Sequence, residues 1–452
     1  MKVLLVNVVC GIKSTGRICT DLAEALESSG HAAESGAACR LGHKVKIAYG
    51  RENIPEKYRK YGIRTASDWE KKLSALSARL LDNAGFSRFN RVSTERLIEE
   101  IREFDPDVIN LHVLHGYWLE LETFFGYLRN CGKKIIWTFH DCWAFTGHCP
   151  YFDYAGCDRW KYMCRDCPCK GEYPAALLLD RSRENYLRKK DLFTGIPNLT
   201  IVTPSNWLKK LVGESFLKEY PVEVINNGID TSVFRRTPEV MAEAERLKEK
   251  YAPGELKAVV AVSTSWDRRK GLPGYFELAD ELGEEYRVII VGLPAEKLSA
   301  LPENVTGVAR TDSPLQLAAF YAMAHCYVNA SLEENYPTTN LEALACGTPV
   351  VTYNAGGSGE SAALYGRVVP VGNVPALAEA VRQICRNRNP VLPVCGAECG
   401  VAFGENCGAE CAPDSGFSGG KDGAGAPFIN REVLDKKAMT SAYLRLFTGQ
   451  TD

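Results

Sequence analysis

The chain has 452 residues, of which 45% are hydrophobic and 24% are charged, an ordinary composition for a soluble globular protein. This length predicts roughly two or three domains, each able to bury a sizeable core. The formal net charge of −2 gives no electrostatic basis for binding nucleic acid. No apolar run approaches the roughly 20 residues of a membrane-spanning helix.

The amino-terminal segment Met1–Cys10 is apolar and leads directly into a glycine loop, Gly11–Gly16. It imitates a short signal peptide but lacks a small-residue cleavage site. A buried parallel strand that feeds the loop explains it better, and we therefore expect a cytoplasmic protein. The two glycines are not a dinucleotide-binding fingerprint, because G-x-G-x-x-G is absent.

Strand-like apolar runs alternate with helix-like stretches along almost the whole chain. In the first half the predicted strands are Val3–Val9, Lys44–Ala48, Val108–Val113, Lys134–Phe139 and Thr200–Thr203. In the second half they are Lys257–Ser263, Arg287–Val291, His325–Ala330 and Pro349–Tyr353. The predicted helices include Gly16–Ser28, Ser93–Glu103, Leu272–Leu282 and Pro314–Met323. Such alternation predicts parallel sheets covered by helices on both faces.

The pattern restarts near Ala258, which predicts two such α/β domains, 1–203 and 204–430, and a C-terminal helix at Arg431–Phe447 within 431–452. Two segments interrupt it: His31–His43, and a Gly-, Pro- and Ala-rich insertion at 386–427 that carries Cys-Gly-Ala-Glu-Cys twice. We expect the second insertion to be a mobile surface loop. Paired α/β domains bind ligands in the cleft between them, at the carboxyl edges of their strands.

The segment Arg59–Arg91 carries eight basic residues against three acidic ones. The apolar side chains of a predicted helix within it lie on one face: Trp69, Leu73, Leu76, Leu80 and Leu81. An ordinary surface helix is the usual interpretation of this pattern.

Histidines follow two predicted strands of the first half. His112, His115 and Tyr117 follow one strand, and His140 follows the next. A lone histidine at the end of a strand is more often structural than functional. We place the first three residues at the same edge of the sheet as His140, as a lining of the cleft.

Seventeen cysteines are present, and an odd total in a long chain of this kind argues against a disulfide framework. Four of them fall within nineteen residues, with Cys169 close behind: Cys149, Cys157, Cys164 and Cys167. The closing Cys-x-x-Cys suits a structural, tetrahedral zinc ion. The leading C-x7-C spacing is wider than common zinc-finger spacings, so free thiols are the alternative. The repeated motif at 395–399 and 407–411 is a weaker candidate for metal.

Two carboxylates, Glu334 and Glu342, lie eight residues apart across a strand-to-helix junction. The preceding strand, His325–Ala330, ends before Pro337, and Leu341–Cys346 is predicted to be helical, with Gly347 at its end. Doubly wound α/β proteins bind anionic ligands at such junctions. Two acids there can accept hydrogen bonds from a hydroxyl-rich ligand while helix N–H groups meet phosphate, which fits a nucleotide-sugar. The alternative is a capping box, Thr339-x-x-Glu342, with Glu334 as a solvated acid.

The stretch Ser331–Val351 resembles the signature of retaining GT-B glycosyltransferases of family 4, the group 1 transferases, in which an acidic pair with seven residues between grips the donor. Four further segments match in order: Gly11–Gly16, Thr138–Asp141, Asn227–Asp230 and Arg269–Gly271. The resemblance implies a GT-B fold, in which two Rossmann-like, doubly wound domains face each other across a cleft. The segment His140–Pro150 resembles the branch associated with bacterial exopolysaccharide assembly, of the colanic-acid type.

The resemblance also implies roles for individual residues. Glu334 contacts the donor sugar near its reacting face, Glu342 holds the ribose hydroxyls, and His140 faces the sugar from the first domain. The loop Asn335, Tyr336, Pro337, Thr338 and Thr339 offers backbone N–H groups to sugar and phosphate, and Gly11 and Gly16 form a loose loop against the diphosphate or the acceptor. Lys270 holds the diphosphate, and His112, His115 and Tyr117 line the acceptor side of the cleft. The family arginine five residues earlier is Ser265 here, so Arg269 or Arg268 takes its role or it is missing.

These observations predict a retaining hexosyltransferase that moves a sugar from a nucleoside-diphosphate donor to a saccharide or lipid-linked acceptor, in exopolysaccharide or cell-surface glycan synthesis. We expect no cofactor for catalysis, no nucleic acid, and contact of the Arg59–Arg91 region with the inner face of the membrane, where lipid-linked acceptors reside. No carboxylate is placed as an obvious covalent nucleophile. The alternatives are a GT-B nucleotide-sugar epimerase and a non-catalytic nucleotide-sugar-binding subunit.

Overall fold

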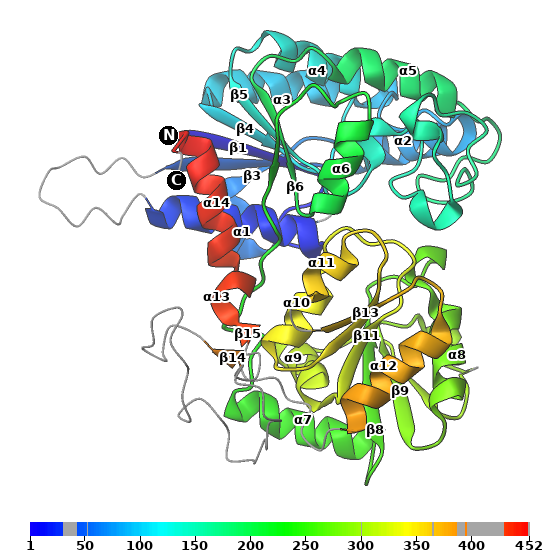
Figure 1. Cartoon of the computed structure of the whole chain (residues 1–452). Helices are drawn as coiled ribbons and strands as arrows, with labels where there is room; N and C mark the ends of the chain where they lie inside the picture. Colours follow the sequence, from blue (N-terminus) through cyan, green and yellow to red (C-terminus); the bar gives the residue numbers. More distant parts are fainter. Residues whose placement is uncertain are drawn as a thin grey trace, which may run out of the picture. The chain divides into compact units, whose positions relative to one another are not determined.

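A computed structural model of the chain describes residues 1–29, 43–51, 53–299, 301–363, 366–386, 394–395 and 429–450. The predicted insertions at 31–43 and 386–427, with the repeated cysteine motif, lie almost entirely outside the described residues. The chain forms two compact units (Figure 1), the first of residues 1–226 and 439–452 and the second of residues 227–438.

The first unit is built on a parallel sheet of seven strands in the order β3-β2-β1-β4-β5-β6-β7. Its strands are β1 (Lys2–Asn7), β2 (Lys44–Tyr49), β3 (Gly62–Arg64), β4 (Val108–Leu111), β5 (Lys134–Thr138), β6 (Leu199–Thr203) and β7 (Val222–Val224). All strands are parallel, but the order in which the chain adds them to the sheet reverses between β1 and β4: the chain builds outward to β3 on one side and to β7 on the other. This is the switch point at whose carboxyl edge open α/β sheets bind ligands.

Helices cover both faces of this sheet: α1 (Lys13–Ser29), α2 (Asp68–Leu81), α3 (Arg91–Phe104), α4 (Leu121–Asn130), α5 (Ser182–Phe193) and α6 (Asn206–Glu214). Alternate residues of a strand enter different cores. Leu4 and Val6 pack with α3 and α4, whereas Val3 and Leu5 pack with α1. Burial on both faces explains why the central strands are continuous apolar runs.

The second unit holds a parallel sheet of six strands in the order β10-β9-β8-β11-β12-β13. They are β8 (Lys257–Val262), β9 (Tyr286–Val291), β10 (Val305–Val308), β11 (Cys326–Asn329), β12 (Val350–Tyr353) and β13 (Gly366–Val369). A short parallel pair, β14 (Val394–Cys395) and β15 (Ile429–Asn430), lies apart from this sheet. The two segments in which charged site residues were predicted follow the neighbouring strands β8 and β11.

Two layers of helices cover the second sheet as well: α7 (Pro238–Tyr251), α8 (Leu272–Leu282), α9 (Pro314–Met323), α10 (Thr338–Ala345), α11 (Ser358–Ala362) and α12 (Val374–Arg386). One core joins α7, α9 and α10 to Val260 of β8. The other joins α8 and α12 to the neighbouring residues Val259 and Ala261. The predicted helices Leu272–Leu282 and Pro314–Met323 are confirmed at both ends.

The boundary between the units differs from the predicted one at 203/204. Residues 204–226 form α6 and β7, and β7 is hydrogen-bonded to β6, so they belong to the first unit. The predicted C-terminal helix is two helices, α13 (Arg431–Leu434) and α14 (Lys436–Thr448), which Asp435 separates. The chain returns to the first unit within α14, where Met439, Tyr443 and Phe447 are buried against α1 and the sheet.

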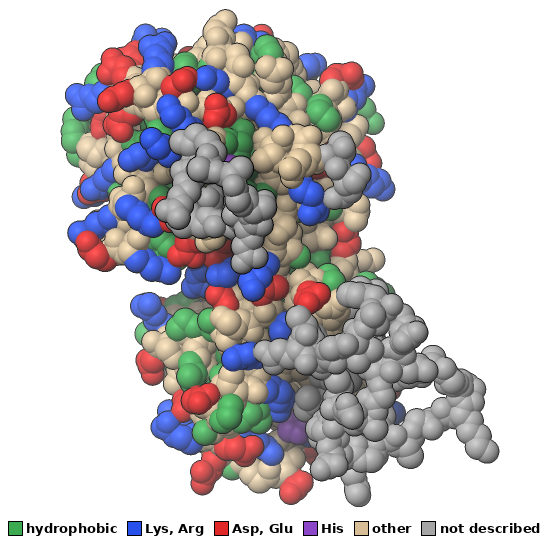
Figure 2. All heavy atoms as spheres, turned by 90° about the vertical axis from the view of Figure 1, so that its left-hand side faces the viewer, with side chains coloured by type: hydrophobic (Ala, Val, Ile, Leu, Met, Phe, Trp, Pro, Cys, Tyr) green, Lys and Arg blue, Asp and Glu red, His purple; other side chains and the backbone are tan. Residues whose placement is uncertain are grey.

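Acidic and basic side chains are interspersed on the face of the protein drawn in Figure 2, as the near-zero net charge suggests. No helix in the described part of the chain combines the length and the apolar character that crossing a bilayer requires.

The return of α14 to the first unit leads to a stability prediction. Phe447 is 3% exposed within the α1 core, so Phe447→Ala should lower the free energy of unfolding of the first unit by about 3–5 kcal/mol, the usual cost of a large-to-small change in a core. Urea denaturation followed by circular dichroism measures it. Ser441→Ala, at an exposed position of the same helix, is the control and should change the stability by less than about 0.5 kcal/mol. Equal effects of the two substitutions would contradict the packing of α14.

Candidate functional site

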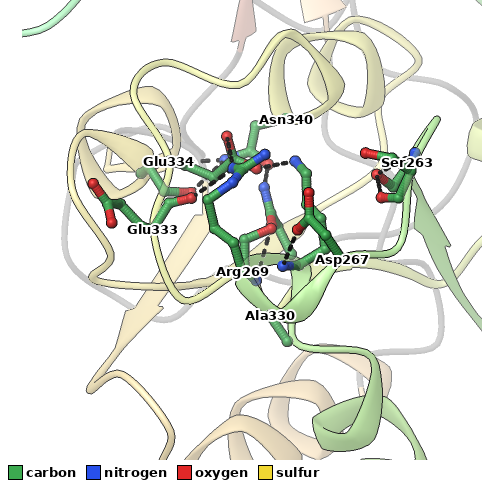
Figure 3. A network of polar contacts seen from close by, with 12 residues as sticks. Ser263, Asp267, Arg269, Ala330, Glu333, Glu334 and Asn340 are labelled. Carbon is green, nitrogen blue, oxygen red and sulfur yellow. Dashed lines mark hydrogen bonds and ion pairs between the residues drawn. The ribbon is translucent and has the colours of Figure 1, made fainter. Parts of the chain in front are cut away.

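The predicted charged site residues of the second unit meet around Glu334, which lies in the loop between β11 and α10 (Figure 3). Glu334 is only 7% exposed. Its Oε1 pairs with Nζ of Lys270, and its Oε2 lies 3.4 Å from Nη1 of Arg269. The same Arg269 nitrogen donates to the backbone carbonyl of Glu333 at 2.8 Å. The structure thus brings the predicted site residue Glu334 together with Arg269 and Lys270, of which Lys270 lies 64 positions earlier in the sequence.

A tight turn after β8 presents the two cations. Residues Arg268–Lys270 form a single 3₁₀ turn whose N-cap is Asp267, and Lys270 N donates to Asp267 Oδ1 at 3.2 Å. The carbonyl of Arg269 accepts from Leu332 N at 2.7 Å, which joins the turn to the loop after β11. Gly271 ends the turn at φ +65°, and a Cβ there would overlap the carbonyl oxygen of Ala330. A glycine is therefore required for this approach.

The charge state of Glu334 follows from competing effects. Burial raises the pKa of its carboxyl group, whereas Lys270 and Arg269 lower it, and the net pKa lies below the ordinary value. Glu334 is therefore an anion at neutral pH, because the two cations compensate for its lost hydration. Of the two arginines considered for the place left by Ser265, Arg269 is half-buried beside Glu334, whereas Arg268 is exposed.

A buried polar network supports the start of α10 beneath the Glu334 loop. Asn340 Oδ1 accepts from Asn329 Nδ2 at 3.0 Å, and Asn340 Nδ2 donates to Ser361 Oγ at 2.8 Å. Ser358 Oγ lies 2.7 Å from Thr352 Oγ1. These bonds tie β11, β12 and α11 to α10, so the loop rests on rigid elements. Gly357 N also donates to the Glu334 carbonyl at 2.9 Å.

The predicted capping box at Thr339 and Glu342 is wrong. The helix begins at Thr338, its N-cap is Pro337, and no side chain caps it. Glu342 consequently lies too far along the helix to reach its first N–H groups. It is buried at 7% exposure and accepts a hydrogen bond on Oε2 from the hydroxyl of Tyr321 on α9, at 2.8 Å.

The other predicted donor residues lie between these two acids. Asn335 and Pro337 are buried, and Tyr336, Thr338 and Thr339 are half-buried. The Tyr336 carbonyl accepts from Asn227 Nδ2 at 3.0 Å, which fixes the loop to the start of the second unit. The first turn of α10 presents N–H groups that no side chain caps, as an anion-binding helix start requires.

The predicted glycine loop of the first unit is shorter than expected. Helix α1 begins at Lys13, so Gly16 lies in its first turn. Of the two glycines, Gly11 alone lies in the loop. Gly11 has φ +71°, and a Cβ there would come within 2.6 Å of the Tyr58 ring. Its N–H donates to the Gly16 carbonyl at 3.0 Å. The loop is closed on itself rather than loose.

His112 and His140 lie at the carboxyl ends of the adjacent strands β4 and β5, as predicted. His112 Nδ1 is 3.0 Å from His140 Nε2, and the two rings are nearly parallel, at 14°. His112 Nε2 lies 2.9 Å from Asn110 Oδ1. Burial lowers the pKa of His112 well below its ordinary value and that of His140 to about 4, so both rings are neutral.

A second network runs beside the first. His115 Nε2 is 2.9 Å from Asp141 Oδ2, and His115 Nδ1 is 3.0 Å from the Tyr173 hydroxyl. Tyr117 meets the Tyr173 ring edge to face, with centroids 6.2 Å apart. His112, His115, His140 and Asp141 line one pocket of the first unit, so the structure gathers the predicted acceptor-side residues about His140.

The predicted zinc ligands Cys149, Cys157, Cys164 and Cys167 line another pocket of the first unit. A hydrogen bond from the Cys149 thiol lowers the pKa of Cys167, and Cys164 Sγ accepts from Gly147 N at 3.2 Å. Within the described residues, however, no group of three or more His, Cys, Asp or Glu side chains is arranged to hold a metal ion. The zinc site stays a prediction.

Sequence reasoning missed two buried polar residues of the first unit. Lys189 on α5 donates to the carbonyls of Trp143 at 2.8 Å and Thr146 at 3.0 Å. Burial lowers its pKa to about 7. Asn110 orients His112 from within a strand that reads as apolar. A lysine in a charged helix and one amide in a strand give no distinctive pattern, so only tertiary contacts reveal them.

Comparison with known proteins places both halves of the chain. Residues 15–233 match the family model described as Glycosyltransferase Family 4, and residues 243–392 match the model described as Glycosyl transferases group 1. Each of the two models thus matches a different half of the chain. The chain is 30% identical over 288 residues to WcaC of Escherichia coli (strain K12), which its name assigns to colanic acid biosynthesis as a glycosyl transferase. The match covers 60% of this chain and 65%, less than two thirds, of that protein.

Solved structures show the same fold. Sucrose-phosphate synthase from Thermosynechococcus elongatus has a TM-score of 0.60 at 17% identity, covering 86% of this chain and 91% of its own. HepE of Anabaena in complex with UDP-glucose has a TM-score of 0.56 at 13% identity, with coverage of 86% and 91%. Two parallel α/β units with these structural neighbours confirm the predicted GT-B fold.

The turn that presents the two cations leads to a second stability prediction. Gly271→Ala places a Cβ against the Ala330 carbonyl in addition to the strain of positive φ, so it should destabilise the second unit. Gly254→Ala is the matched control, because Gly254 has φ +63° with no atom within 4 Å of the added Cβ. The control should cost roughly 1–2 kcal/mol, and Gly271→Ala clearly more. Urea titration compares them, and equal midpoints would show that the close approach is not needed.

Proposed function

We propose that this chain is a retaining hexosyltransferase that moves a sugar from a nucleoside-diphosphate donor to a saccharide or lipid-linked saccharide acceptor. The observation that carries the proposal is the buried cluster of Lys270, Arg269 and Glu334 beside the first turn of α10. It lies within the part of the chain that matches the group 1 domain. The name of WcaC and the structure of HepE with UDP-glucose support a polysaccharide product and a nucleotide-sugar donor.

The cluster suits the donor because its parts match the charges of a sugar diphosphate. Lys270 and Arg269 bind the diphosphate together with the N–H groups at the start of α10. In the unliganded protein the carboxylate of Glu334 forms ion pairs with both cations. When the diphosphate binds Lys270 and Arg269 instead, the carboxylate of Glu334 is released and accepts hydrogen bonds from the sugar hydroxyls. Glu342, oriented by Tyr321, accepts hydrogen bonds from the ribose hydroxyls.

The same cations assist the departure of the leaving group. As the bond between the anomeric carbon and the diphosphate oxygen breaks, negative charge develops on that oxygen and Lys270 and Arg269 stabilise it. The acceptor hydroxyl forms its new bond on the same face of the sugar and gives its proton to the leaving diphosphate. The configuration is retained, and the products are the glycoside and a nucleoside diphosphate. The role of a metal in stabilising this charge falls to the two cations.

A donor panel tests this reaction directly. The protein is incubated with UDP-, GDP- and ADP-sugars, with and without saccharide acceptors, and nucleoside diphosphate release is measured. We expect release that depends on acceptor and a glycoside of retained configuration by NMR. Release of a free epimerised sugar without acceptor would identify the epimerase alternative. Binding without turnover for every pair would leave a nucleotide-sugar-binding subunit.

Two substitutions probe the cluster. Glu334→Gln and Lys270→Ala should each lower kcat/KM for transfer by at least about 100-fold, the loss typical when one stabilising group at a developing charge is removed. Steady-state assays of nucleoside diphosphate release measure it, with circular dichroism to verify folding. Lys250→Ala removes an exposed lysine of α7 as the charge-matched control and should leave the rate unchanged. Full activity of a folded Glu334→Gln or Lys270→Ala variant would refute the assignment.

We also propose that the α2 region contacts an anionic membrane. The residues of α2 that turn inward are the small Ser74 and Ala78, so the helix leaves Trp69 64% and Leu76 53% exposed. Leu177 N donates to the Arg79 carbonyl at 2.7 Å, which sets the exposed residues 177–179 beside the helix. Exposed apolar side chains beside the basic residues Lys71, Lys72 and Arg79 fit a surface that contacts lipid. A lipid-linked acceptor would be reached from there.

Vesicle binding tests this surface. Trp69→Ser combined with Leu178→Ser should reduce co-sedimentation with vesicles of phosphatidylglycerol and phosphatidylcholine, because each change removes apolar area that would enter the interface. Val433→Ser, which removes an exposed apolar side chain of the second unit (60% exposed), is the control and should leave sedimentation unchanged. Binding that is equal on neutral and anionic vesicles, or is unaffected by the double substitution, would contradict membrane contact through α2.

A further inference from the structure

We propose that His112 is a positioning residue that, together with Asn110, holds His140 in the tautomer with its proton on Nε2 and a lone pair on Nδ1. His140 then acts as a neutral hydrogen-bond acceptor for a sugar hydroxyl and not as a proton donor. The inference deepens the proposed function and rests on it for the identity of the ligand. The tautomer itself follows from hydrogen bonds within the first unit.

The orientation of Asn110 is the starting point. Its Nδ2 donates to the backbone carbonyl of Ile136 at 3.1 Å and to Thr138 Oγ1 at 3.2 Å. Because a carbonyl only accepts, the amide nitrogen must lie on this side. The Oδ1 atom therefore faces His112, and an amide oxygen can only accept. Asn110 is fully buried, so water does not offer a competing partner.

The proton positions of the two histidines follow in turn. His112 Nε2, 2.9 Å from Asn110 Oδ1, must carry a proton to make this bond. A neutral imidazole has one N–H, so Nδ1 of His112 is an acceptor. His140 Nε2, 3.0 Å away, must then be the donor. The proton of a neutral His140 is thus on Nε2 and its lone pair is on Nδ1, as the partner of one ring nitrogen sets the role of the other.

The environment keeps both rings neutral. Burial lowers the pKa of His112 well below its ordinary value, and His140 lowers it further. Burial also lowers the pKa of His140 to about 4, with Asp141 raising it and His115 lowering it. The carboxylate of Asp141 is committed to His115 and to the backbone N–H of Trp143. A neutral pair transmits the tautomer without ambiguity, because a doubly protonated ring would accept no hydrogen bond.

The chain of bonds is anchored on three elements. The backbone N–H of His112 donates to the Val6 carbonyl at 2.8 Å, and Trp137 Nε1 donates to the His112 carbonyl at 3.2 Å. Thr138 Oγ1 lies 3.0 Å from the Tyr443 hydroxyl of α14. The series of hydrogen bonds thus runs from the C-terminal helix through Thr138, Asn110 and His112 to His140. Such anchoring holds the ring in one orientation before a ligand arrives.

The wild-type protein tests the tautomers without any substitution. Long-range ¹H–¹⁵N correlation spectra of protein labelled with ¹⁵N-histidine distinguish the Nε2–H form, the Nδ1–H form and the doubly protonated ring. The chain has seven histidines, and single His-to-Gln changes assign the signals. We expect His112 and His140 both in the Nε2–H form at pH 7. An Nδ1–H or doubly protonated His140 would overturn the proposal, whether or not the protein transfers sugar.

Substitution of His112 tests the positioning role. His112→Phe removes the acceptor, so His140 should lose its single Nε2–H pattern, and kcat should fall at least about tenfold, as losses of an orienting partner do, with a smaller change in the donor KM. His112→Gln keeps a side-chain acceptor and should restore the Nε2–H pattern and part of kcat. His325→Gln in the second unit is the control and should change neither.

Two outcomes would overturn the role of His112. An unchanged His140 pattern in a folded His112→Phe variant would show that other contacts set the tautomer. A pattern that changes while kcat does not would show that the tautomer is irrelevant to transfer. If His112→Phe fails to fold, His112→Gln and the wild-type spectrum decide. Absence of transfer by the wild-type protein would refute the proposed function but leave the spectroscopic result standing.

Discussion

A buried carboxylate organises the second unit. Glu334 is enclosed by protein, and an ionised acid in such a place is stable only when cations and hydrogen bonds replace its water. The cations come from the turn after β8, which reaches the acid because β8 and β11 are neighbours in the sheet and Gly271 offers no Cβ to the Ala330 carbonyl. Parallel topology, one glycine and one ion-pair cluster therefore depend on each other. The cluster of charged side chains thus follows from the need to compensate a buried carboxylate.

The two units apply the same structural rule with different chemistry. Each places its polar residues where neighbouring parallel strands end, since only there does backbone leave a buried sheet. In the second unit these residues are ionised, and the capless start of α10 adds N–H groups, which together suit a diphosphate. In the first unit burial keeps His112 and His140 neutral. Neutral donors and acceptors suit hydroxyl groups, which carry no charge.

The sequence predicted the interior of both sheets well and their edges poorly. Apart from the short pair β14 and β15, the described strands that the apolar pattern missed are β3, β7, β10 and β13, the edge strands of the two large sheets. Edge strands are short and solvated on one side, and Glu223 in β7 or Arg367 in β13 interrupts any apolar run. The cap assigned to Glu342 failed for a related reason: a helix start that shifts by one residue changes the partners of every side chain in its first turns.

The site shows a similar division between what sequence pattern reveals and what it does not. The resemblance to a known family predicted roles for Glu334, Lys270 and His140, and all three lie in loops that follow strands, where functional residues are common. Choosing Arg269 over Arg268 required the turn geometry, which points one of two adjacent arginines inward. Asn110 was invisible, since one amide in a buried strand looks like a tolerated defect. Yet its cost of burial is met only if every polar atom is bonded, and this requirement fixes the protons of two histidines. In a neutral network these bonding requirements determine which atom donates and which accepts each hydrogen bond. The amino-acid composition of the chain does not reveal this.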